Sequence, residues 1–176
     1  MNTHDLRQAQ LHFNLSEFKE SRKHLHKLRD KFVKDFSLKN LKKLPIDDYV
    51  IGSGSHSFCY RLERELDLLG RILGATAHKF GVYYSQSRDE YIYTQKWGDN
   101  YEDAYENVRS AVIDLIIAGR DGDFDHIVNS KISSMFKGKI LSTYYPDRYL
   151  NIFSDEHLNH YLSFFGLDFN TLNDPV

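Results

Sequence analysis

Apolar residues recur at three- and four-residue spacing in two long segments of the chain, which predicts two amphipathic helices. In residues 17–43 the apolar stripe consists of Leu25, Leu28, Phe32, Val33 and Phe36. In the segment after residue 100 it consists of Tyr101, Ala104, Tyr105, Val108, Ala111, Val112, Leu115 and Ile116. Asn100 is a suitable N-cap for the second helix, and Gly119 is expected to end it.

Alternating aromatic residues predict a β-hairpin near the middle of the chain. Residues 80–84 and 90–97 are the expected strands, and the polar segment 85–89 joins them. Residues 149–153 alternate in the same way, so a further short strand is expected there.

Capping residues and glycines predict the remaining helices. Ser57 is a suitable N-cap for a helix that Gly70 would end, and Ser154 opens a helix ending at Gly166. An apolar helix carrying lysines is expected over residues 131–145. Together these elements predict an α+β fold: a helical N-terminal arm and a small, mostly antiparallel sheet with a β-hairpin, covered by several helices.

A change in composition at Leu44–Pro45 predicts an internal boundary. Residues 1–45 are expected to form a basic helical arm, residues 46–170 an α+β recognition domain, and residues 171–176 a linker stub toward a following domain. The 176 residues suffice for one domain with a substantial core.

The charges are distributed unevenly along the chain. Residues 17–43 contain ten Lys or Arg against four Asp or Glu, a balance of +6. The whole chain carries −2, so the remainder carries −8. Two interpretations of the basic segment remain open: the solvated face of a packed helix, or a row of cations for the phosphates of a nucleic acid.

Composition excludes several classes of protein. A single cysteine, Cys59, permits no internal disulfide, so a cytoplasmic location is expected, with Cys59 as a small buried side chain. No apolar run approaches the ~20 residues of a membrane span, so no membrane partner is expected. The polar start, residues 1–5, does not resemble a signal peptide.

Catalytic and metal-binding patterns are incomplete in this sequence. The loop of residues 52–57 lacks the lysine and the spacing of a phosphate-binding GxxxxGK[ST] loop. Asp147 follows a proline, as in some nuclease centres, but residues 155–158 lack the lysine that such a centre needs. His157 and His160 are three residues apart without a third ligand nearby in sequence. The chain is therefore expected to be non-catalytic and to hold no cofactor or metal.

Four blocks of the sequence resemble a known family. They are residues 46–52, 57–63, 79–83 and 136–162, the last of which contains the run Tyr144-Tyr145-Pro146-Asp147. The blocks resemble the region preceding the GTPase motor in McrB-type subunits of modification-dependent (McrBC-like, type IV) restriction systems. The resemblance implies an N-terminal DNA-recognition domain of an anti-phage defence system that reads a modified cytosine. It also implies a GTPase motor elsewhere in the full-length protein and a separate nuclease subunit as partners.

The predicted function is the binding of double-stranded DNA, methylated or otherwise modified, by basic and aromatic residues. Lysines would hold the backbone, and aromatic rings would stack on bases at ~1–3 kcal/mol per base. The expected DNA-binding residues are Lys23, Lys27, Lys31, Lys79, Tyr83, Lys96, Trp97, Lys131, Lys137 and Lys139.

Two alternatives remain open at this point. The first is a protein-interaction or adaptor module of a defence complex without DNA contact, which predicts scattered lysines and one exposed apolar patch. The second is a small hydrolase that uses His and Asp residues in an order that the sequence does not reveal.

Overall fold

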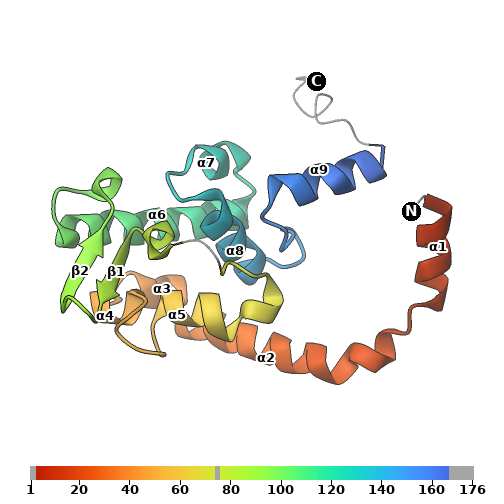
Figure 1. Ribbon diagram of the computed structural model, residues 1–176, viewed down its shortest axis with the longest axis horizontal. Helices are drawn as coiled ribbons and strands as arrows, with labels where there is room; N and C mark the ends of the chain where they lie inside the picture. Colours follow the sequence, from red (N-terminus) through yellow and green to blue (C-terminus); the bar gives the residue numbers. More distant parts are fainter. Residues whose placement is uncertain (1–2, 74–75, 167–176) are drawn as a thin grey trace.

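The computed structural model describes residues 3–73 and 76–166 (Figure 1). Its longer helices are α1 (Thr3–His12), α2 (Lys19–Asp35), α6 (Tyr101–Asp121), α8 (Ser134–Tyr144) and α9 (Asp155–Phe164). Short helical segments are η1 (Leu15–Phe18), α3 (Leu38–Leu41), α4 (Ile46–Tyr49), α5 (Phe58–Tyr60), η2 (Arg61–Glu65), η3 (Asp67–Leu69), η4 (Ala77–Phe80), η5 (Gln95–Trp97) and α7 (Phe124–Asn129). β1 (Val82–Ser85) and β2 (Glu90–Tyr93) pair antiparallel. The predicted α+β class is confirmed, and the expected linker, residues 171–176, lies outside the described residues.

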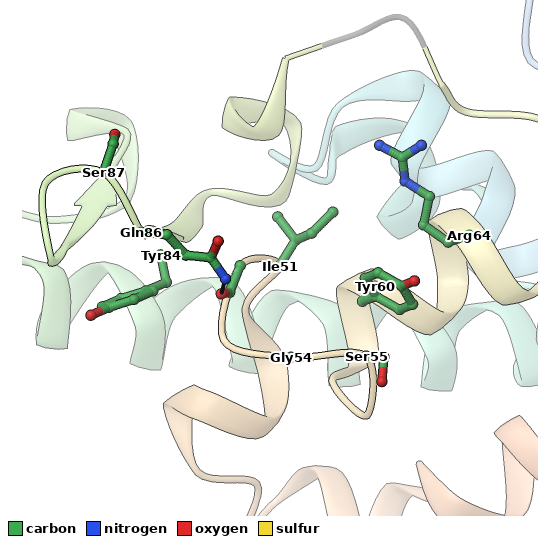
Figure 2. A pocket seen from close by; sticks show the side chains of 9 residues that line it. Ile51, Gly54, Ser55, Tyr60, Arg64, Tyr84, Gln86 and Ser87 are labelled. Atoms are coloured by element: carbon green, nitrogen blue, oxygen red, sulfur yellow. Dashed lines mark hydrogen bonds between the residues drawn. The ribbon is translucent and has the colours of Figure 1, made fainter.

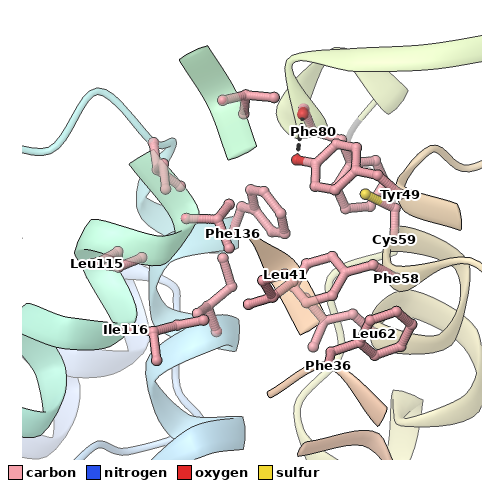
Figure 3. Close-up of a cluster of buried hydrophobic side chains, with 14 of the residues drawn as sticks. Phe36, Leu41, Tyr49, Phe58, Cys59, Leu62, Phe80, Leu115, Ile116 and Phe136 are labelled. Atoms are coloured by element: carbon pink, nitrogen blue, oxygen red, sulfur yellow. Dashed lines mark hydrogen bonds between the residues drawn. The ribbon is translucent and has the colours of Figure 1, made fainter. Parts of the chain in front are cut away.

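One aromatic cluster joins the helices of the body (Figure 3). The fully buried ring of Phe58 lies 5.3 Å from Phe32, 5.1 Å from Phe36 and 5.7 Å from Tyr49, centroid to centroid. Phe136 of α8 lies 6.5 Å away on another side of the ring. These rings come from α2, α4, α5 and α8, so their contacts fix the relative positions of segments that are far apart in sequence.

The end of the basic arm belongs to the same core. Phe32 and Phe36 at the end of α2, and Leu41 and Leu44 after it, are buried with the residues of the main body. Leu44–Pro45 therefore lies inside one packed unit. In contrast, the first half of α2 extends away from the body and leads back to η1 and α1 (Figure 1). No described helix is long and apolar enough to cross a membrane.

The segment from Ser57 to Gly70 is helical, as predicted, but its middle part is wound more widely. The Ser57 hydroxyl accepts the N–H of Tyr60, and the chain then forms the π-helix η2. Within it, the N–H of Leu66 donates to the carbonyl of Arg61 five residues earlier, at 3.0 Å. Gly70 follows η3 with φ of +111°, a conformation that favours glycine.

The predicted hairpin is present, with shorter strands than expected. The register pairs Val82 with Tyr93 and Ser85 with Glu90. Residues 95–97 form a turn of 3₁₀ helix instead of the end of a strand, because Trp97 turns inward and is only 6% exposed. The second strand therefore ends at Tyr93.

The long helix α6 ends three residues later than predicted. Asn100 caps its start by accepting the N–H of Asp103, as expected. Gly119 is an interior residue of the helix, and Gly122, with φ of +74°, forms the C-cap. Gly119 serves packing instead: a Cβ atom there would lie 2.5 Å from Leu141 Cδ2 and 3.0 Å from Tyr145 Cε2.

The strand predicted over residues 149–153 is wrong, because that segment lies against helices and has no partner strand among the described residues. Phe153 packs its ring against two glycines. A Cβ atom would lie 2.9 Å from the ring at Gly70 and 2.5 Å from it at Gly138. Tyr149 and Phe153 both pack against the core, so the alternation of apolar residues reflects side-chain packing of a segment that is not a strand. The following helix, α9, is capped by Ser154 as predicted and ends at Phe164, just before Gly166 with its φ of +69°.

The close packing at Gly119 gives a prediction about stability. We expect Gly119→Ala to lower the free energy of unfolding by about 1–3 kcal/mol, because the added methyl group overpacks the contact with α8. Chemical denaturation followed by circular dichroism measures this change. Ser110→Ala, at an exposed position of α6, is the control and should be neutral or slightly stabilising. A Gly119→Ala protein as stable as the wild type would contradict this account of the packing.

Candidate nucleic-acid interface

The first half of α2 presents a basic face to solvent. Lys19, Lys23 and Lys27 follow one another at intervals of four residues, which places them on one side of the helix. Phe32 and the residues after it enter the core, whereas residues 19–27 include no buried side chain. The face borders a shallow hollow of about 720 Å³ lined by Ser16, Lys19, Arg22, Lys23, His26, Lys27 and Asp30.

Acidic neighbours compensate only part of this positive charge. Residues 19–27 contain four Lys or Arg and one Glu, a balance of +3. Lys23 lies 4.0 Å from Glu20, and both side chains are largely exposed, so water screens this pair strongly. Within the described part of the chain, Lys19, Arg22 and Lys27 form no ion pair. The face is therefore open to an anionic partner.

A network of charges fixes the other end of α2 to the body. Asp35 accepts hydrogen bonds from Lys31 at 2.6 Å and from Arg61 at 2.7 Å. Arg61 also donates to Glu65 at 2.5 Å, and its guanidinium lies over the rings of Phe32 and Phe36. The hydrogen bond from Lys31, followed by that from Arg61, lowers the pKa of Asp35. Lys31, one of the expected DNA-binding residues, thus forms an ion pair with Asp35 in this network.

The expected hairpin residues Lys79 and Tyr83 are not free on the surface. The Lys79 ammonium lies 2.5 Å from the Glu63 carboxylate, and both side chains are 5% exposed. Tyr83 is partly buried, with its ring 5.2 Å from that of His78. In this conformation Lys79 stabilises the buried Glu63 and cannot reach a phosphate outside the body.

Three expected residues do come together, in a second hollow of about 460 Å³ beside α6. The Lys96 ammonium donates to the carbonyl of Lys131 at 3.1 Å and lies over the ring of Trp97 at 5.5 Å. Trp97 lies under this lysine and is 6% exposed, so little of its ring is available for stacking on a base. Asp114 also lines the hollow and reduces its positive character.

The two lysines expected on α8 are structural in this conformation. Lys137 donates to the carbonyl of Val128 at 3.1 Å, and burial lowers its pKa. Lys139 is fully buried and donates to the carbonyls of Leu66 at 2.6 Å and Gly70 at 2.7 Å. Lys139 therefore satisfies backbone groups at the end of the helical segment that begins at Ser57. Lys131 lies before α8 instead of on it.

The expected DNA-binding residues thus fall into separate groups. Lys23 and Lys27 lie on the projecting half of α2, whereas Lys96 and Lys131 lie beside α6. In Figure 1 the hairpin and the free half of α2 lie toward opposite ends of the long axis of the molecule. The residues that the structure describes therefore form no face that combines the basic arm with the hairpin lysines.

A polar cleft between the hairpin and η2 was not predicted from the sequence (Figure 2). Its volume is about 740 Å³, and its lining includes Tyr60, Arg64, Tyr84 and Gln86. These residues lie in two segments separated by about twenty positions, so no local spacing in the sequence brings them together. The glycines of the loop at residues 52–54 were the only signal of a special backbone there.

Other chemical groups singled out in the sequence are arranged as follows. Cys59 is buried, and desolvation raises the pKa of its thiol well above the ordinary value, which disfavours the reactive thiolate. His157 and His160 are exposed on α9, and Asp147 is exposed in the turn after α8. The described residues contain no cluster of three or more His, Cys, Asp or Glu that would hold a metal ion.

Comparisons with family models, with curated proteins and with solved structures each found no match to this chain.

The buried Lys139 gives a prediction about pH. Desolvation lowers its pKa to about 8, below its ordinary value of 10.5. Between these two values the unfolded chain binds more protons than the folded one, so stability rises with pH. We expect the free energy of unfolding of the wild type, relative to that of Lys139→Met, to increase by on the order of 1 kcal/mol per pH unit across this window.

Urea denaturation of both proteins between pH 7 and pH 10 measures the difference, and the tyrosines common to both cancel. A difference that stays constant with pH would show that the Lys139 amine is not held neutral in the folded protein. Lys139→Met should itself be less stable at every pH, because it leaves the carbonyls of Leu66 and Gly70 without their donor.

Proposed function

We propose that this chain is a DNA-binding module whose first contact with the duplex is the basic face of α2. The single observation that supports this most is the group formed by Lys19, Arg22, Lys23 and Lys27 on the half of the helix that projects from the body. Its role is recognition without catalysis. In the McrBC-like restriction system that the sequence resembles, a GTPase motor and a separate nuclease subunit would act on the DNA.

The geometry of the face suits a phosphate backbone. Lysines four residues apart on a helix are separated by about 6 Å along its axis, so three of them form a row about 12 Å long. Side chains of this length reach different phosphates of one strand without distortion of either partner. Such contacts release counterions and therefore supply affinity that depends steeply on salt, without specifying sequence.

The proposal restricts the DNA contacts to fewer residues than the sequence indicated. Lys79, Trp97 and Lys139 hold other parts of the body together, and we do not assign them to DNA. Reading of a modified base would then belong to a surface other than the Trp97 hollow. The α2 face serves to position the module.

One observation favours the second candidate, an adaptor that binds another protein. Leu11, Phe13 and Phe18, which precede the basic face in the sequence, are 76%, 59% and 47% exposed, and the rings of Phe13 and Phe18 stack at 5.5 Å. Large exposed apolar groups that lie together are typical of protein-interaction surfaces. The arm thus offers an apolar and a basic surface, which separate variants can test.

We expect the chain to bind a short duplex with an affinity that falls about 100-fold between ~50 and ~200 mM salt, as four phosphate contacts require. Fluorescence anisotropy with a labelled duplex measures this. Charge reversal of Lys19, Lys23 and Lys27 to Glu should reduce the salt slope by about 0.9 per contact and weaken binding at least tenfold.

The matched control reverses Lys39, Lys42 and Lys43, which are also exposed and change the net charge by the same amount. If both triple variants lose the same affinity, the effect is one of net charge and the α2 face has no special role. Phe13→Ser with Phe18→Ser should leave DNA affinity unchanged. Absence of binding at low salt would exclude the DNA proposal and leave the adaptor candidate.

A further inference from the structure

The cleft beside the hairpin has walls that the backbone holds in place. The N–H of Tyr84 donates to the carbonyl of Ile51 at 3.0 Å, and the side-chain amide of Gln86 donates to the carbonyl of Gly52 at 3.0 Å. Ser53 ties the same loop to the end of α4 through the carbonyls of Asp47 and Val50. Hydrogen bonds to the hairpin and to the end of α4 therefore hold the loop at residues 51–55 in place. The cleft between this loop and η2 is formed by these backbone positions.

The charge of the cleft favours an anion. Among the described residues that line the cleft, Arg64 is the only charged one. Its Nε lies 3.2 Å from Glu63, but Glu63 also holds the Lys79 ammonium at 2.5 Å. The carboxylate is 5% exposed and turned inward, whereas the Arg64 side chain is 53% exposed. Glu63 thus orients the guanidinium and leaves its terminal N–H groups available for a ligand.

The remaining lining suits an aromatic ring with polar edges. Tyr60, one helical turn before Arg64, presents a partly exposed ring, and Figure 2 shows it below the arginine on the same wall. The opposite wall carries Gln86 with Ser87 of the hairpin turn, and Ser55 lies at the end of the loop. The carbonyl oxygen of the Gln86 amide remains an acceptor, since the bond to Gly52 uses only its nitrogen.

We propose that this cleft binds a nucleoside monophosphate unit. Arg64 takes the phosphate in charge-assisted hydrogen bonds, the Tyr60 ring stacks on the base, and the amide of Gln86 reads its polar edge. The volume of about 740 Å³ lies in the usual range for small-molecule sites. The site shares no residue with the basic hollow on α2, so it does not depend on the function proposed for that face.

The test uses the full chain and three probes: deoxycytidine 5′-monophosphate, deoxycytidine and inorganic phosphate. Isothermal titration calorimetry should show saturable binding of the monophosphate and binding at least tenfold weaker of each of the other two. Arg64→Gln should weaken the monophosphate about tenfold or more, the loss of a charge-assisted contact. Tyr60→Leu should weaken it about fivefold or more, whereas Tyr60→Phe, which keeps the ring, should not.

Arg71→Gln is the matched control, because Arg71 is 72% exposed, pairs with Asp67 and does not line the cleft. It should bind the monophosphate like the wild type. Equal losses in Arg64→Gln and Arg71→Gln, or no saturable binding of the monophosphate by the folded wild type, would overturn the proposal. Charge reversal of Lys19, Lys23 and Lys27 should leave this binding unchanged, so failure of the α2 proposal and failure of this one are distinguishable.

The same unit occurs as a free nucleotide and at the end of a DNA strand, and two oligonucleotides separate these sources. A 5′-phosphorylated single strand is compared with the same strand carrying a 5′-hydroxyl. Tighter binding of the phosphorylated strand, abolished by Arg64→Gln, identifies a strand end as the ligand. Equal binding of the two strands, together with saturable binding of the monophosphate, identifies the free nucleotide.

Discussion

The burial of the Phe58 ring is the constraint on which the other contacts depend. Rings from α2, α4 and α8 meet around it, so the end of the basic arm, the loop before the cleft and the helix that carries Lys139 are held by one cluster. Loss of this ring would leave a cavity among elements from three parts of the chain, at a typical cost of 3–5 kcal/mol for Phe→Ala. The positions of both proposed binding surfaces therefore derive from an apolar centre that contacts neither ligand.

Some of the cations of this chain lie inside the fold and others on its surface. Several lysines that the sequence predicted as DNA contacts instead bind groups of the protein itself. Lys79 pairs with Glu63, Lys139 donates to two carbonyls, and Lys31 pairs with Asp35. Since a buried ammonium without partners is costly, the buried Lys79 and Lys139 fix the chain around them. Among the cations that stay exposed are those on the free half of α2 and Arg64.

Periodicity and capping predicted most of the helices and the hairpin, because these depend on local sequence: Asn100, Ser57 and Ser154 each cap the helix that they were expected to cap. The errors arose where tertiary contacts decide. Gly119 does not end a helix; it lies inside one, where the close approach of Leu141 leaves no room for a side chain. Residues 149–153 alternate without forming a strand, and the ring of Phe153 packs over two glycines. Burial of Trp97 and Lys139, and the assembly of the cleft, follow from packing between distant segments that no spacing reveals.

The π-helical turn η2, Arg61–Glu65, carries side chains that serve both the arm and the cleft. It allows Arg61 to reach Asp35 on the arm while Arg64 lines the cleft. A π-helical turn holds one residue more than the α-helical turn that would replace it. Deletion of a single residue here would preserve a helix yet rotate every side chain beyond it by about 100°. This segment should therefore tolerate substitutions at its exposed positions far better than any change in its number of residues.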